Sequence, residues 1–156
     1  MKDRKTLREG SIALIVLAVL DLINWVTSGL AEFINGDIDD AIAEVAPDLM
    51  SAVKACFVVI LALQAALILA QIIIGWFGLK VSRNPIANQG YITAAKVFYV
   101  LNIIAAVSAV ISLIGSGSDA LISNILTLIC ALADVLIYYY FIKSAKAVRQ
   151  SVLENK

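Results

Sequence analysis

The chain has 156 residues, of which 62% are hydrophobic and 15% are charged, and its mean hydropathy is +0.94. Soluble domains are about 45–50% apolar and about 25% charged. Twelve basic and twelve acidic residues cancel, and the chain has no histidine, two cysteines and two prolines. These totals exclude a disordered chain, a nucleic-acid-binding protein with a net basic field, a disulfide scaffold and any chemistry that needs imidazole. The composition predicts an integral membrane protein.

Four apolar stretches have the length of a membrane-spanning helix, which is about 20 residues (range 17–25). They cover residues 11–34, 55–79, 97–114 and 120–142. The second and third carry no charge, whereas Asp21 and Glu32 interrupt the first and Asp134 interrupts the fourth. Helices that are apolar on all sides have no polar face for water. We therefore expect an all-α fold, a membrane four-helix bundle that forms a single transmembrane domain over residues 1–156.

The positions of the charges predict the orientation in the bilayer. Eleven of the twelve basic residues fall on one side of the predicted spans, and only Lys54 falls on the other, together with seven acidic residues. By the positive-inside rule both termini are cytoplasmic. In the acidic outer loop, Ile38, Ala41, Ile42 and Val45 recur at helical spacing and predict a short amphipathic helix over about 38–46. The acidic residues of this loop are either solvated or hold a hard cation, although they do not match an EF-hand.

The two predicted hairpins resemble each other in sequence. Residues 69–80 align without gaps to residues 132–143, and residues 19–23 align to residues 100–104. The pattern fits two duplicated, parallel helical hairpins related by an axis along the membrane normal. The other explanation is chance similarity within a limited apolar alphabet, with the shared aromatic-then-lysine ending serving as an interface anchor.

Each predicted span carries polar side chains at a depth where lipid disfavours them. With a rise of about 1.5 Å per residue, Asp21, Gln71 and Asp134 lie about 14–16 Å above the cytoplasmic boundary and Asn102 lies about 9 Å above it. Similar depths predict one polar cluster near the midplane. Its candidate ligand- or ion-binding members are Asp21, Asn24, Gln64, Gln71, Asn102, Asp134 and Tyr138.

Two of these residues, Asp21 and Asp134, form a candidate intramembrane acid pair. No lysine or arginine lies at their predicted depth, so each carboxyl must be protonated, bind a cation or reach a water-filled cavity. Three interpretations are open: hydrogen bonds between helices, handling of a proton or cation, and binding of a small ligand.

The sequence contains no catalytic constellation, no cluster of metal ligands, no glycine-rich phosphate loop and no Cys-x-x-Cys motif. We therefore expect no enzymatic activity, no cofactor and no nucleic-acid partner. The predicted function is that of a small membrane protein, a homo-oligomer in the lipid bilayer, whose polar midplane handles a proton, cation or small polar solute. The alternative is an accessory protein that binds a membrane-protein partner through its acidic outer loop.

One segment carries a resemblance to known proteins. Gly75-x-x-Gly78-Leu79-Lys80-x-Ser82-Arg83-Asn84-Pro85, followed by an apolar helix, resembles small, uncharacterised four-helix membrane proteins of Gram-positive bacteria. The resemblance covers the whole topology and implies a location in the bacterial cytoplasmic membrane. It implies no catalytic residues and no role for Asp21 or Asp134.

The predicted topology is testable by cysteine labelling. A membrane-impermeant reagent added from outside should modify a cysteine that replaces Ser118 and should spare one that replaces Asn88. The wild type, which already carries Cys56 and Cys130, supplies the background signal. The reverse labelling pattern would contradict the orientation.

Overall fold

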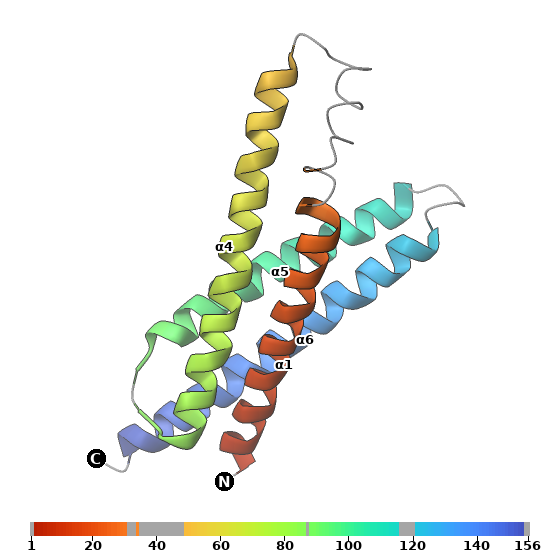
Figure 1. Ribbon diagram of the computed structural model, residues 1–156. Coiled ribbons are helices and arrows are strands. Elements are labelled where there is room, and N and C mark those ends of the chain that lie inside the picture. The colour runs from red at the N-terminus through yellow and green to blue at the C-terminus, as the bar shows by residue number, and fades with distance from the viewer. Residues whose placement is uncertain (1, 31–33, 35–48, 87, 116–120, 155–156) are drawn as a thin grey trace. The chain divides into compact units, whose positions relative to one another are not determined.

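The computed structural model describes residues 2–30, 34, 49–86, 88–115 and 121–154. Within these residues the chain forms four α-helices and no β-strand (Figure 1). They are α1 (Lys2–Asn24), α4 (Met50–Arg83), α5 (Gly90–Gly115) and α6 (Leu121–Glu154), and a short π-helix, η1 (Trp25–Leu30), follows α1 directly. The all-α, four-helix fold is confirmed. The amphipathic helix predicted over 38–46 lies outside the described residues.

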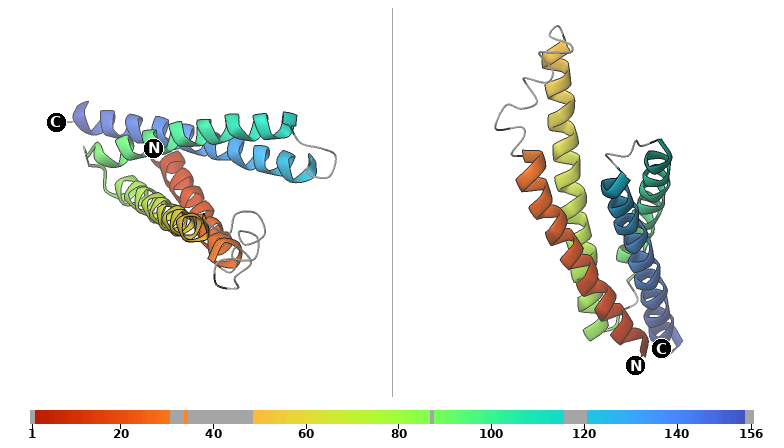
Figure 2. Two further views of the ribbon diagram at one scale, coloured as in Figure 1. Left: turned by 90° about the horizontal axis from the view of Figure 1, so that it is seen from above. Right: turned by 90° about the vertical axis from the view of Figure 1, so that its right-hand side faces the viewer.

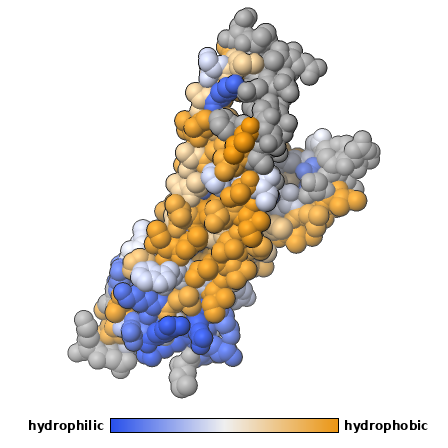
Figure 3. Space-filling view, viewed as in Figure 1, coloured by the Kyte–Doolittle hydropathy of each residue, from blue (hydrophilic) through white to orange (hydrophobic). Residues whose placement is uncertain are grey.

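Each of the four helices is long and apolar enough to cross a membrane, over Lys2–Thr27, Met50–Arg83, Gly90–Gly115 and Asn124–Glu154. Large apolar side chains are exposed along all of them, and Leu20, Val59, Ile111 and Leu126 are each more than half exposed. Figure 3 shows such surface over α1 and α4, and it shows hydrophilic residues gathered at the end where the two chain termini lie. Soluble monomers rarely expose continuous apolar surface of this extent. The protein is therefore a multi-pass integral membrane protein.

The helices are longer than the apolar segments within them. α4 and α6 have 34 residues each, a length of about 51 Å against a hydrocarbon core of about 30 Å. α6 continues for twelve residues past the predicted span, from Lys143 to Glu154, and α1 begins at Lys2 rather than at residue 11. Hydropathy locates the lipid-facing part of a helix, whereas the helix itself continues through any residues that favour it.

Local sequence signals set several helix ends. α4 ends at Arg83, directly before Asn84 and Pro85, because a proline disfavours helical geometry in the residue that precedes it. Before α5, the Asn88 side-chain oxygen accepts a hydrogen bond from the Gly90 backbone N–H at 2.8 Å, as a capping residue does.

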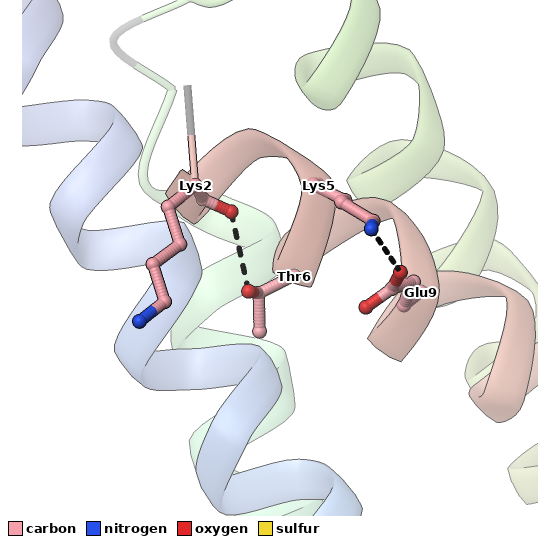
Figure 4. Close-up of polar contacts among 4 residues, drawn as sticks. All are labelled: Lys2, Lys5, Thr6 and Glu9. Atoms are coloured by element: carbon pink, nitrogen blue, oxygen red, sulfur yellow. Dashed lines mark hydrogen bonds and ion pairs between the residues drawn. The ribbon is translucent and has the colours of Figure 1, made fainter.

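The charged first turns of α1 are also stabilised locally. Lys5 Nζ lies 3.8 Å from a carboxylate oxygen of Glu9, and the Thr6 hydroxyl donates to the Lys2 carbonyl at 3.2 Å (Figure 4). Both contacts join residues four apart on one helix face. The ion pair is exposed to solvent, so it contributes a few tenths of a kcal/mol at most.

The chain forms two compact units, which we describe separately: Met1–Leu14 with Ile74–Lys156, and Ile15–Ile73. In the first unit α5 and α6 lie side by side as an antiparallel hairpin (Figure 2). Its hydrophobic core combines that hairpin with the start of α1 and the end of α4. The core residues are Leu7, Leu14, Ile74, Val81, Tyr91, Ile92, Ala95, Tyr138, Phe141, Ile142, Ala145 and Val148.

The closest approach in this core is at Gly78 of α4. A Cβ atom at this position would collide with Ser11 Oγ of α1 and would lie 2.5 Å from Cε2 and 2.9 Å from Cζ of Phe141. Both neighbours are fully buried, so neither has free space to move into. Ser11 satisfies its hydroxyl within α1 by donating to the Leu7 carbonyl at 2.6 Å. Only glycine fits here, as is common where membrane helices pack closely.

The second unit pairs the rest of α1 with the first two thirds of α4. The Trp25 indole Nε1–H donates to the Leu61 backbone carbonyl at 3.2 Å. Ala18, Leu61 and Ile68 are buried in this unit. The indole hydrogen bond shows how the two antiparallel helices are aligned. The levels of the nearby polar residues along the helices are counted from it.

Two glycines that face Phe141 offer a matched test of this packing. Gly78→Ala should lower the free energy of unfolding by about 1–3 kcal/mol, because the added methyl group overpacks a filled core. Gly10→Ala places its Cβ at an ordinary 3.6 Å from Phe141, so it should be neutral or gain up to about 1 kcal/mol of helix propensity. Thermal unfolding in detergent, followed by circular dichroism, measures both. Equal effects at the two positions would contradict the close packing at Gly78.

Candidate functional site

Three of the predicted site residues, Asn102, Asp134 and Tyr138, lie in the α5–α6 hairpin. Tyr138 is fully buried, and its ring stacks on Phe98 of α5 with ring centroids 5.9 Å apart and planes 17° apart. Aromatic pairs at this separation stabilise a structure by about 0.5–1.5 kcal/mol beyond the area they bury. The Phe98–Tyr138 stack therefore sets the alignment of the two helices.

This alignment brings Asn102 and Asp134 to matching positions. Asn102 follows Phe98 by one turn of α5, and Asp134 precedes Tyr138 by one turn of α6, so in an antiparallel pair both steps lead in the same direction. Both side chains are half-buried. The Asn102 amide donates to the Phe98 carbonyl of its own helix at 2.9 Å, which leaves its side-chain oxygen as an acceptor. One carboxyl and one amide thus lie on neighbouring helices, one turn beyond the aromatic stack.

The other four predicted residues, Asp21, Asn24, Gln64 and Gln71, lie in the α1–α4 unit. Asp21 precedes Trp25 by one turn, so in an antiparallel pair the Trp25–Leu61 hydrogen bond sets it at about the level of Ala65 of α4, the residue after Gln64. Gln71 lies six residues further along α4, about 9 Å away along its axis. Asp21, Asn24 and Gln64 are exposed and Gln71 is half-buried. Within this unit Asp21 therefore corresponds in level to Gln64 rather than to Gln71.

The predicted residues thus form two groups, one in each unit. The first group combines Asn102 and Asp134 with the buried ring of Tyr138. The second combines Asp21 with Gln64, and η1 begins directly after Asn24. π-Helical turns are rare and often occur at functional sites. A single midplane cluster that contains both groups stays a prediction from the sequence.

The two hairpins do not pack in the same alignment. The predicted duplication matches Asp21 to Asn102 and Gln71 to Asp134. In α5–α6, Asn102 and Asp134 share one level, whereas in the α1–α4 unit Asp21 and Gln71 are six residues out of step. The duplication stays a prediction, and the two hairpins do not share equivalent contacts.

The chemistry available in these groups is that of oxygen ligands and proton carriers. Carboxyl and amide oxygens suit a proton, a hard cation or a polar solute. Among the described residues there is no group of three or more histidine, cysteine or acidic side chains that could hold a metal ion. Cys56 and Cys130 are exposed free thiols.

A basic groove between α5 and α6 was not predicted from the sequence. It has a volume of about 780 Å³, and Lys96, Lys143 and Lys146 are among the residues that line it. The spacing of Lys143 and Lys146 already places them on one helix face.

Comparisons with protein-family models, with curated proteins and with solved structures give no match. The site is therefore interpreted from its own residues.

The role of Tyr138 is testable by truncation. Tyr138→Ala should lower the free energy of unfolding by about 3–5 kcal/mol, because it removes a fully buried ring and its stacking contact with Phe98. Tyr140→Ala, which removes a 54% exposed ring from the same helix, should change it by no more than about 0.5 kcal/mol. Thermal unfolding in detergent compares the two variants. A small effect at Tyr138 would remove the stack as the determinant of the α5–α6 alignment.

Proposed function

We propose that this is a small, non-enzymatic membrane protein whose intramembrane polar side chains handle a proton, a cation or a small polar solute. The observation that carries the proposal is the Phe98–Tyr138 stack, which sets Asp134 and Asn102 at a similar level of adjacent helices, one turn beyond it. A carboxyl group and an amide at matched height offer oxygen atoms from two helices to one small guest.

The position of the acidic side chain within an apolar span supports this function. The nearest basic residues along the two helices are Lys96, six residues from Asn102, and Lys143, nine residues from Asp134. These separations correspond to about 9 Å and 14 Å along the helix axes. An ionised carboxylate in hydrocarbon is costly, and acidic residues within membrane helices commonly mark ion or proton pathways. A proton or a cation bound at Asp134 lowers this cost.

Asp21 extends the same chemistry to the α1–α4 unit, where it lies level with the Gln64 turn. A carboxyl group beside an amide therefore occurs in each unit. The distribution of basic residues predicts that both termini lie inside, and the resemblance of the Gly75–Pro85 segment implies a bacterial cytoplasmic membrane. A homo-oligomer is the favoured assembly, since four helices of one chain leave little room for a water-filled path and a subunit interface provides it.

The test is ion flux into proteoliposomes. The wild type should carry protons or a monovalent cation down a gradient, and the double variant Asp21→Asn/Asp134→Asn should lose most of that flux, because asparagine keeps the shape but can neither ionise nor release a proton. The control is Asp3→Asn/Glu154→Gln, which removes two acidic groups near the ends of α1 and α6. It should retain the flux of the wild type.

Cation-dependent stability gives a second readout of the same site. A cation present at one hundred times its Kd stabilises the folded state by about 2.7 kcal/mol, and the double asparagine variant should lose this gain. Equal flux in all three proteins would contradict the proposal. The polar groups would then serve as hydrogen-bond partners between helices, as in an accessory membrane protein.

A further inference from the structure

The α5–α6 groove combines a cavity, a cluster of cations and an apolar wall. Its volume of about 780 Å³ lies in the range of sites for small ligands, about 300–1,000 Å³. Both helices line it, with Lys96, Tyr99 and Val100 from α5 and Tyr139, Ile142, Lys143 and Lys146 among those from α6. All of these residues belong to one compact unit of the chain.

Positive charge is concentrated at one end of this groove. Lys96 and Lys146 also line a smaller adjoining pocket of about 220 Å³, which Arg149 borders as well. Among the residues that the structure describes, four cationic side chains line these two neighbouring hollows and no acidic residue does. Within the described residues none of the three lysines takes part in an ion pair. Cations gathered in this way repel one another, and a bound anion relieves that repulsion.

The opposite end of the groove is apolar and aromatic. Val100 and Tyr139 belong to the predicted apolar spans and are 53% and 46% exposed, and Ile142 forms a buried part of the wall. Lys146 and Gln150 lie beyond the predicted end of the fourth span, at residue 142. From Tyr139 to Gln150 the groove follows α6 for about 16 Å. It therefore crosses from the lipid-facing surface to the basic surface.

We propose that the α5–α6 groove is a binding site for an anionic phospholipid, with the headgroup phosphate held by Lys96, Lys143 and Lys146 and an acyl chain lying along Val100 and Tyr139. Basic pockets between transmembrane helices on the cytoplasmic side suit such headgroups. Two tyrosines, Tyr99 and Tyr139, line the groove between its cationic and apolar ends, and tyrosine is enriched where a protein meets the headgroup region. The apolar end distinguishes a lipid from a free phosphate ion, which would use the cations alone. The site is independent of the polar groups within the spans.

The full-length protein in a non-ionic detergent allows a direct test by native mass spectrometry. The probes are phosphatidylglycerol, phosphatidylcholine with matched acyl chains, and inorganic phosphate. The wild type should bind phosphatidylglycerol in preference to phosphatidylcholine, and inorganic phosphate should not displace it at equal concentration.

Two variants separate the groove from general surface charge. Lys96→Gln/Lys146→Gln should weaken phosphatidylglycerol binding about thirty-fold, at about a tenfold loss for each 1.4 kcal/mol and about 1 kcal/mol for each basic side chain. The control Lys2→Gln/Arg4→Gln removes two exposed cations at the start of α1, outside the groove, and should leave binding within about twofold of the wild type.

A steric variant tests the apolar end with every charge retained. Val100→Trp fills the groove from a half-exposed position and should also weaken phosphatidylglycerol binding. Equal losses in the two charge variants would reduce the effect to bulk electrostatics and overturn the proposal. Unchanged binding in Val100→Trp, or displacement by inorganic phosphate, would replace the lipid with a soluble anion. If the wild type carries no proton or cation flux but still binds phosphatidylglycerol, the proposed function is contradicted and the lipid site is not.

Discussion

The packing of the first unit depends on one close contact, the approach of α4 to α1 and α6 at Gly78. Lipid tails are as apolar as the helix surfaces, so burial from water does not drive helices together inside a bilayer, and van der Waals contact between well-fitted surfaces takes its place. The absent side chain at Gly78 lets Ser11 and Phe141 approach the α4 backbone. Ser11 tolerates burial there because its hydroxyl bonds to its own helix. The first unit is assembled around this contact.

The position of this core has a consequence for the polar groups. Leu7, Val81, Ala145 and Val148 are almost completely buried, and all four lie outside the predicted apolar spans. The dense packing therefore lies at the end of the unit that carries the basic residues, where the extensions of α4 and α6 continue past the hydrocarbon. Farther along α5, Ala106 and Ala109 are buried. Most of the larger side chains in this part of α5 and α6 are exposed. Asn102 and Asp134 lie between these regions.

Two kinds of polar chemistry are thus separated by depth. Carboxyl and amide groups lie within the apolar spans. An ionised group there has a high free energy, which a bound proton or cation lowers. Lysines and an arginine line the α5–α6 groove at the end of those spans, where anionic headgroups are available. The Phe98–Tyr138 stack lies between the two regions and fixes both of them. One hairpin therefore positions a candidate ion site and a candidate lipid site without sharing residues between them.

The sequence by itself determined the all-α fold, the four apolar helices and the identity of the polar residues within them, because long apolar segments have one low-energy form in lipid, in which each backbone group bonds within its own helix. Local signals also account for the end of α4, which stops directly before Asn84 and Pro85. The lengths of the helices were not predictable in the same way. The predicted apolar span ends at Ile142, whereas helix-favouring residues continue α6 to Glu154.

Only the tertiary structure decided how the helices align. Depth counted along each predicted span set Asp21 and Gln71 at similar levels, whereas the Trp25–Leu61 hydrogen bond aligns Asp21 with the turn that holds Gln64. The sequence could not supply this, because a helix can slide along its neighbour by a turn and keep the same hydrophobic face. Specific contacts remove that freedom: the missing side chain of Gly78, the indole of Trp25 and the ring of Tyr138 each fit at one position. The α5–α6 groove has the same origin, since it exists only when two separate helices bring their lysines together.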